Sequence, residues 1–200
     1  MWPWGHAALG YIVYSLALRA GRRRVTGAEA AVLAVGTQTP DLVDKTLAWG
    51  LDVFAAGYAA GHSVFVVVPV GVAVVALAAR RGRPRLGLAA VVGCWTHLAG
   101  DVLVAVVFSR QYTYERVLWP VVELPASHSS ASFLGQVGYY ATRFLAYLAA
   151  AESLLPLAVY VAPSVLAVGL WLADGRPGLG YVRQAVARAV RWTTEGEPSR

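Results

Sequence analysis

Residues 86–108 read LGLAAVVGCWTHLAGDVLVAVVF, a stretch of 23 residues in which His97 and Asp101 alone break an uncharged, apolar run. A helix of this length is long enough to cross the ~30 Å hydrocarbon core of a membrane. His97 and Asp101 are four residues apart, so a helix places both side chains on one face, about one turn apart. One helix can therefore offer a nitrogen and an oxygen to a single cation.

The composition indicates an integral membrane protein. Of the 200 residues, 58% are hydrophobic and 14% are charged, and the mean hydropathy is +0.54. These values are far from those of an ordinary soluble domain. Apolar stretches near the ~20 residues that a spanning helix needs predict an all-α bundle of about five transmembrane helices. The first is short and the second is interrupted at Pro40, and they cover 4–18, 29–50, 59–79, 86–108 and 154–173.

The basic residues predict the orientation of this bundle. Thirteen of the 17 Lys and Arg residues follow the first, third and fifth apolar stretches, on one side of a five-helix bundle. The positive-inside rule makes that side cytoplasmic and places the N-terminus outside. We therefore expect a multi-pass protein of the inner (cytoplasmic) membrane. Its transmembrane domain would cover 1–175, followed by a basic cytoplasmic tail over 176–200.

Two segments outside the apolar stretches also carry expectations. The segment 109–153 should lie over the outer face of the membrane domain. Its aromatic residues suit a belt at the membrane interface. The Gly, Ser and Pro residues around His128, a predicted loop residue, suit a lid. In the tail, residues 181–192 could lie on the anionic inner leaflet. The simpler interpretation of the basic residues is that they are solvated and set the orientation of the protein in the membrane. The net charge of +6 indicates no nucleic-acid partner, because the basic clusters lack interleaved base-stacking residues.

Ionisable side chains from four of the stretches are expected at one depth. Counting about 1.5 Å per residue from the basic inner ends puts them at ~18 to ~27 Å, in the outer half of a core about 30 Å thick. An ionisable group in hydrocarbon costs several kcal/mol unless it meets a cavity, a partner or a metal, so this convergence indicates a functional site. The residues are His6, Asp41, His62, His97 and Asp101.

Imidazole and carboxylate groups together form a ligand set for zinc or another first-row divalent ion. The single cysteine, Cys94, permits neither an intrachain disulfide nor a thiolate cage. We therefore predict one or two divalent ions, with Zn²⁺ favoured, and an open ligand position for water. Single residues also have simpler explanations: His6 alone would hydrogen-bond to a neighbouring helix, and a turn at Pro40 by itself favours Asp41 and Asp44.

Five short motifs carry a resemblance to a known family. They read WPWGH at 2–6, GTQTPDLVDK at 36–45, GHS at 61–63, THLAGD at 96–101 and LWP at 118–120. In this order they resemble the membrane-bound metal-dependent hydrolases that include the LexA-regulated inner-membrane proteins of bacteria. A more distant similarity is to zinc-dependent phospholipase C and the single-strand nucleases of the same helical fold. The resemblance to phospholipase C and the nucleases implies one metal ion held by Asp41, His62, His97 and Asp101. It also implies that Asp101 bridges to a second metal ion near His6.

These observations predict a membrane-embedded, divalent-metal-dependent hydrolase whose site opens outward. A metal-activated water would attack a phosphoester such as a lipid head group. Asp44 would be the general base or the carboxylate that orients a metal ligand. The expected partners are the lipid bilayer and a lipid or phosphoester substrate. The alternative is a transporter or ion-translocating protein in which the same residues form a cation path, and a small membrane scaffold that binds metal is a third interpretation.

Overall fold

The computed structural model describes residues 1–108, 110–126, 132–150 and 154–194. Within these residues every regular element is helical, as the sequence predicts. The elements are α1 (Pro3–Ala20), α2 (Gly27–Lys45), the π-helical turn η1 (Thr46–Gly50), α3 (Val64–Arg80), α4 (Pro84–Val107), the 3-10 turn η2 (Tyr114–Val117), α5 (Phe133–Ala149), α6 (Leu155–Ala173) and α7 (Leu179–Thr194).

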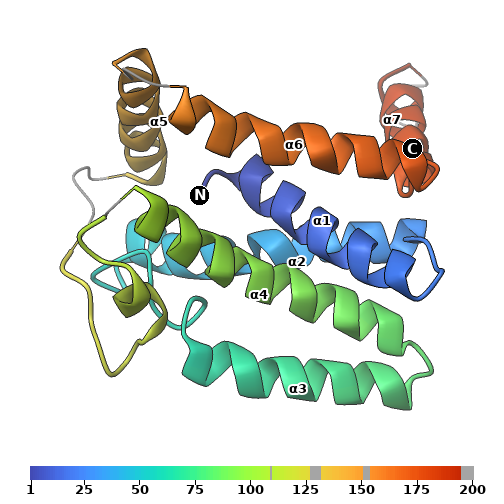
Figure 1. Cartoon of the computed structure of the whole chain (residues 1–200), viewed down its shortest axis with the longest axis horizontal. Helices are drawn as coiled ribbons and strands as arrows, with labels where there is room; N and C mark the ends of the chain where they lie inside the picture. The colour runs from blue at the N-terminus through green and yellow to red at the C-terminus, as the bar shows by residue number, and fades with distance from the viewer. Residues whose placement is uncertain (109, 127–131, 151–153, 195–200) are drawn as a thin grey trace, which may run out of the picture.

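Helices α1, α2, α3, α4 and α6 run along the long axis of the molecule, whereas α5 and α7 cross its opposite ends (Figure 1). α4 packs against α1, α2 and α3, and α6 packs against α1. Among the described residues, α4 is the one helix both long and apolar enough to cross a membrane; α3 and the Leu157–Ala173 part of α6 are apolar but shorter. The all-α class is thus confirmed, and the five spans stay a prediction.

Small residues allow α2 and α4 to approach each other closely. A Cβ atom on Gly36 of α2 would lie 2.5 Å from the carbonyl oxygen of Ala90. A Cβ atom on Gly93 of α4 would lie 2.7 Å from the carbonyl oxygen of Leu33. Glycine at both positions therefore permits direct contact between the two backbones, a common way for helices to pack in membranes. This contact sets side by side the two helices that carry most of the candidate site.

Two element boundaries differ from the expectation. α2 is not interrupted at Pro40, because it continues to Lys45 and ends in the π-helical turn. Pro40 has no N–H to offer the carbonyl of Gly36, but the packing of α2 against α4 keeps the helix intact on both sides of it. α3 begins at Val64 rather than at residue 59, so His62 lies in the turn before the helix and not inside a spanning segment.

The segment 109–153 contains a helix, α5, that the sequence did not predict. Phe144 of α5 packs against Trp2, with ring centroids 4.9 Å apart. Tyr140 of the same helix stacks on Trp49, with centroids 5.5 Å apart. Aromatic contacts therefore fix α5 across the end of the bundle at which α1 begins (Figure 1).

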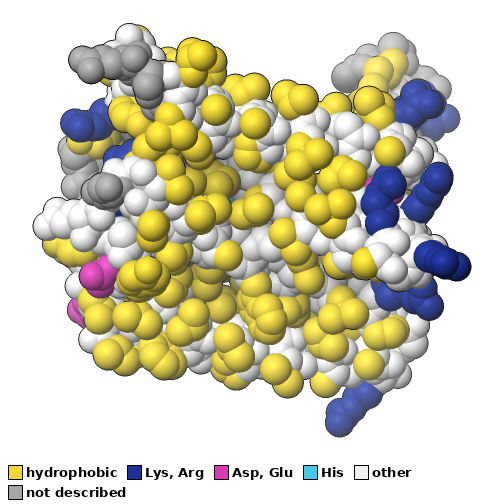
Figure 2. Space-filling view, in the orientation of Figure 1, with side chains coloured by type: hydrophobic (Ala, Val, Ile, Leu, Met, Phe, Trp, Pro, Cys, Tyr) yellow, Lys and Arg dark blue, Asp and Glu magenta, His cyan; other side chains and the backbone are white. Residues whose placement is uncertain are grey.

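Ion pairs between buried carboxylates and partly exposed arginines hold the opposite end together. Asp174, after the end of α6, accepts hydrogen bonds from the Ser15 hydroxyl (2.6 Å) and the Arg19 guanidinium (2.7 Å). Glu29 of α2 pairs with Arg85 of α4 at 2.5 Å. Figure 2 shows most of the Lys and Arg side chains of this face at this end, a few at the opposite end, and hydrophobic side chains over the middle of the bundle. The two ends of the molecule thus differ strongly in basic charge.

Candidate metal centre

Four candidate ligands come from three separate parts of the chain. Asp41 lies on α2, and His62 lies in the turn before α3. His97 and Asp101 lie on α4. One ligand atom from each of the four lies within 4.8 Å of the others, in a group that could hold a metal ion. All four residues are buried. His128, expected in a loop away from this group, lies outside the described residues.

Hydrogen bonds fix the tautomers of the two imidazole rings. Nδ1 of His97 lies 2.6 Å from the backbone carbonyl oxygen of Thr37, which can only accept, so this nitrogen carries the proton. Nδ1 of His62 lies 2.8 Å from Oδ2 of Asp44 and donates to that carboxylate. In each neutral ring Nε2 is therefore a lone-pair nitrogen. Carbonyl and carboxylate partners of this kind orient metal-bound histidines in known metal sites.

The two lone-pair nitrogens face each other, with Nε2 of His62 3.2 Å from Nε2 of His97. Oδ1 of Asp41 lies 3.4 Å from the first nitrogen and 3.6 Å from the second. Oδ2 of Asp101 lies 3.6 Å and 3.8 Å from them. Four ligands bonded at about 2.0–2.2 Å to a tetrahedral zinc ion would be about 3.3–3.6 Å apart. The four atoms therefore need little movement to share one ion.

The environment of several buried polar atoms also fits a bound cation. Oδ1 of Asp41 and both ring nitrogens of His6 are buried without a hydrogen-bond partner among the residues that the structure describes. A buried polar atom without a partner costs about 1–3 kcal/mol. Lone pairs and carboxylate oxygens held this close repel one another unless a cation or a proton lies between them. The donor set thus fits a divalent ion.

His6 lies beside the four-residue group rather than within it. Its ring stacks on that of His97, with centroids 3.5 Å apart and planes 9° from parallel. Its Nε2 lies 3.4 Å from Oδ1 of Asp101. The α-amino group of Met1 pairs with the same oxygen. The two oxygens of Asp101 therefore face different neighbours, since Oδ2 faces His62 and His97 and Oδ1 faces His6.

Asp44 is fully buried and holds the turn before α3. Its carboxylate accepts hydrogen bonds from the backbone N–H groups of Ala59 (2.7 Å), Gly61 (2.7 Å) and His62 (3.0 Å), in addition to the His62 ring. A Cβ atom on Gly61 would lie 2.8 Å from the carbonyl oxygen of Pro40, so glycine is needed for this close approach. Of the two roles predicted for Asp44, this geometry favours the orientation of His62.

Three residues at the edge of the cluster received no role from the sequence. Lys45 donates to Oδ2 of Asp41 at 2.5 Å. The ring of Tyr58 meets the His62 ring edge-on, with centroids 4.7 Å apart. The guanidinium carbon of Arg116 lies 4.6 Å from the centroid of the Tyr58 ring. The i, i+4 spacing of Asp41 and Lys45 could have indicated the first contact, but no sequence pattern connects Tyr58 with Arg116.

Comparison with known proteins identifies a family. A family model described as YdjM inner membrane protein matches residues 1–176, which include the whole cluster and end before α7. No curated protein and no solved structure matches the chain. The match agrees with the inner-membrane part of the resemblance seen in the motifs. The similarity to phospholipase C stays a prediction.

Proposed function

The chain belongs to the YdjM inner membrane protein family, and from this premise we propose that it is a membrane-embedded hydrolase that uses a divalent metal ion to cleave phosphoesters. The observation that carries the proposal is the opposed pair of imidazole nitrogens in His62 and His97, 3.2 Å apart and flanked by two carboxylates. Nitrogen and oxygen donors of this kind suit Zn²⁺ or another first-row ion. Catalytic zinc keeps a position for water, and beside these four side chains the water would be a fifth ligand.

The four-residue cluster would hold the ion. When bound, the ion would supply a water of lowered pKa and would polarise a phosphoryl oxygen. Asp44 would position His62 through the Nδ1–H group, and the carbonyl of Thr37 would position His97. In the reaction the water oxygen bonds to phosphorus, the ester P–O bond breaks, and the alcohol leaves with a proton.

A second ion would lie on the His6 side of Asp101. Oδ1 of Asp101 faces this side, and the two nitrogens of His6 are buried there without a hydrogen-bond partner among the described residues. The proposal therefore allows one or two ions, with Asp101 between them in the second case.

Lys45 and Arg116 would give the site its preference for an anionic substrate. Both side chains are half-buried at the edge of the cluster. Nε of Arg116 donates to the carbonyl of Tyr112 at 2.7 Å, which helps to fix the guanidinium over the Tyr58 ring. A phosphodiester would gain charge-assisted hydrogen bonds from these cations, whereas an uncharged carboxylic ester would gain much less. A phosphoester is therefore the favoured substrate class.

We also propose that α1, α2, α3, α4 and α6 all span the membrane. Their common direction along the long axis supports this arrangement (Figure 1). The hydrophobic side chains that cover the middle of the bundle, between its basic end and the end at which α5 lies, support it too (Figure 2). The positive-inside rule then puts the basic end in the cytoplasm and the N-terminus outside. The metal centre would lie near the outer surface, within reach of a phospholipid head group in the outer leaflet.

The test is hydrolysis by the purified full-length protein in detergent. A generic phosphodiester and a phospholipid would be supplied to Zn²⁺-loaded and to chelator-treated protein. Asp101→Asn should abolish the metal-dependent turnover, whereas Asp52→Asn, the same change at an exposed aspartate outside the cluster, should leave it unchanged. Stoichiometric metal with no hydrolysis of either substrate, together with flux of the metal into proteoliposomes, would replace the hydrolase by the transporter.

A further inference from the structure

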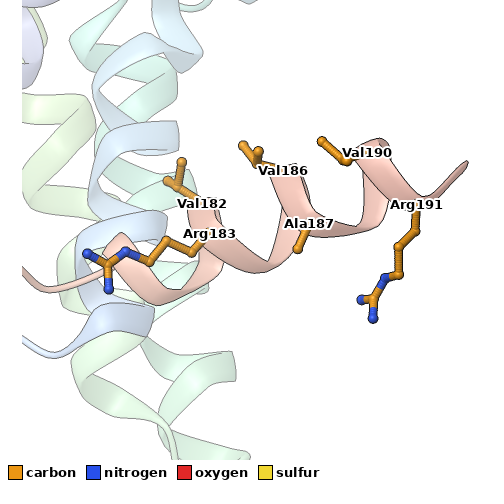
Figure 3. Close-up of a pocket in the computed structure, with 6 residues that line it drawn as sticks. All are labelled: Val182, Arg183, Val186, Ala187, Val190 and Arg191. Carbon is orange, nitrogen blue, oxygen red and sulfur yellow. The ribbon is translucent and has the colours of Figure 1, made fainter. Parts of the chain in front are cut away.

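The last described helix lies away from the metal centre, at the basic end of the bundle (Figures 1 and 2). Its start is anchored to α2: a Cβ atom on Gly27 would lie 3.2 Å from the backbone nitrogen of Gly178 and 3.2 Å from the ring of Tyr181. Beyond this anchor, every residue of 180–191 whose side chain is described is exposed. The anchor therefore sets the direction of α7, and the rest of the helix projects from the bundle (Figure 3).

α7 has an apolar side and a basic side. Val182, Val186 and Val190 follow one another at i, i+4 spacing and project from one side of the helix (Figure 3). They are 59%, 56% and 54% exposed. Arg191 projects from the opposite side (Figure 3), and the helix contains three arginines and no Asp or Glu. A row of exposed valines beside arginines is the composition of a helix that lies in a membrane interface.

We propose that α7 lies in the membrane interface at the basic end of the bundle and binds anionic phospholipid head groups. The helix crosses the bundle axis, which is the direction parallel to a membrane surface in the spanning arrangement proposed above (Figure 1). Its valines would enter the boundary of the acyl chains, and its arginines would meet the negative head groups. Exposed arginines in the turns at the same end extend this positive surface, namely Arg22, Arg23, Arg24, Arg80, Arg81 and Arg83.

The charge of α7 favours lipid over a protein partner. A protein surface that covered three valines would also have to supply acidic groups for Arg183, Arg188 and Arg191, in a geometry that matches this one helix. An anionic leaflet supplies both the apolar layer and the negative charge along the whole length of the helix. The proposal rests on the spanning arrangement and is independent of hydrolysis, because α7 contributes no residue to the metal centre.

Accessibility of nitroxide labels in the full-length protein tests this proposal. Cys94 is the single cysteine of the chain, so Cys94→Ala provides a background for labels introduced one at a time by Val186→Cys and Gln184→Cys. These two positions lie on opposite sides of a helix. The protein would be reconstituted in nanodiscs of phosphatidylcholine, with and without phosphatidylglycerol. With the anionic lipid, the label at 186 should be open to oxygen and protected from a water-soluble nickel chelate, and the label at 184 should show the reverse.

The arginines provide the second arm of the experiment. Replacing Arg183, Arg188 and Arg191 together with Gln should remove the protection at position 186, as should omission of phosphatidylglycerol. Equal access of the nickel chelate to both labels in anionic discs would overturn the proposal. Protection that is the same without anionic lipid would overturn it too, as would a label at 186 shielded from both reagents, which indicates a protein partner. Loss of interfacial contact with hydrolysis retained would count against this proposal alone.

Discussion

Nε2 of His62 and Nε2 of His97 lie 3.2 Å apart in a fully buried part of the molecule. The two residues come from different parts of the fold. In His62, Nδ1 donates a hydrogen bond to the Asp44 carboxylate, and in His97, Nδ1 donates to the Thr37 carbonyl. Neither ring can turn without giving up that hydrogen bond. The two lone pairs therefore stay directed at one point, and a cation that binds there finds its ligands already oriented.

Replacing Asp44 with Asn should weaken metal binding about 10–100-fold, the usual effect of removing the group that orients a ligating histidine. The amide has one acceptor oxygen, so it cannot serve all four donors that the carboxylate accepts. Competition with a chromophoric chelator measures the affinity, and Asp52→Asn is the matched control. Folded Asp44→Asn protein with wild-type affinity would refute the positioning role.

Replacing Arg116 with Gln should raise KM for a phosphodiester by about 10–150-fold and change kcat little, because a lost charge-assisted hydrogen bond to a substrate is worth about 1.5–3 kcal/mol. Arg143→Gln is the matched control, since this guanidinium also lies over a tyrosine ring, 5.6 Å from the centroid of Tyr139, but on the exposed helix α5. Steady-state kinetics separates the two constants. An equal fall in kcat and kcat/KM would mean that Arg116 acts on the transition state and not on substrate binding.

Replacing Asp174 with Ala should destabilise the protein by about 2–4 kcal/mol, because it leaves the buried Ser15 hydroxyl and the partly buried Tyr11 and Arg19 groups without their acceptor. The Asp174 carboxylate accepts from Tyr11, Ser15 and Arg19 and joins the end of α6 to α1. Thermal unfolding in detergent would report a lowered Tm, with Glu123→Ala as the control at an exposed acidic residue. A Tm equal to that of the wild type would show that this cluster contributes little to the packing of α6.

Reporter fusions after Arg24, Arg85 and Arg191 should all report the cytoplasm. The reason is the gathering of Lys and Arg at one end of the bundle, which sets orientation during insertion (Figure 2). A fusion within 109–126 should report the outside. An external signal from the fusion after Arg85 would contradict the five-span arrangement and, with it, the outward metal centre.

The sequence predicts most of the helices because apolar stretches and basic turns are local signals. The stretch 154–173, for example, corresponds almost residue for residue to α6. α5 was missed because its amphipathic pattern lies in a polar, aromatic segment that resembles a belt or loop. Pro40 was wrongly expected to break α2, since the helix-breaking effect of proline is local whereas the packing of α2 against α4 is not.

The candidate site, too, could be predicted from the sequence only in part. His97 and Asp101 could be paired from their i, i+4 spacing, and their place in an apolar run indicated a functional role. Asp44 is bound to the turn that contains His62 by hydrogen bonds from backbone N–H groups. A pattern of side chains in the sequence cannot predict these bonds. Contacts such as that of Arg116 with Tyr58 join distant parts of the chain and require the fold itself.

The metal content of the purified protein tests the central claim most directly. After incubation with Zn²⁺ and gel filtration, elemental analysis should find one or two equivalents of zinc per chain in the wild type. His97→Ala should carry none, whereas Cys94→Ala, a change on the same helix outside the cluster, should keep the wild-type content. Wild-type protein without stoichiometric divalent metal, or His97→Ala protein with undiminished metal, would contradict a metal centre at this site.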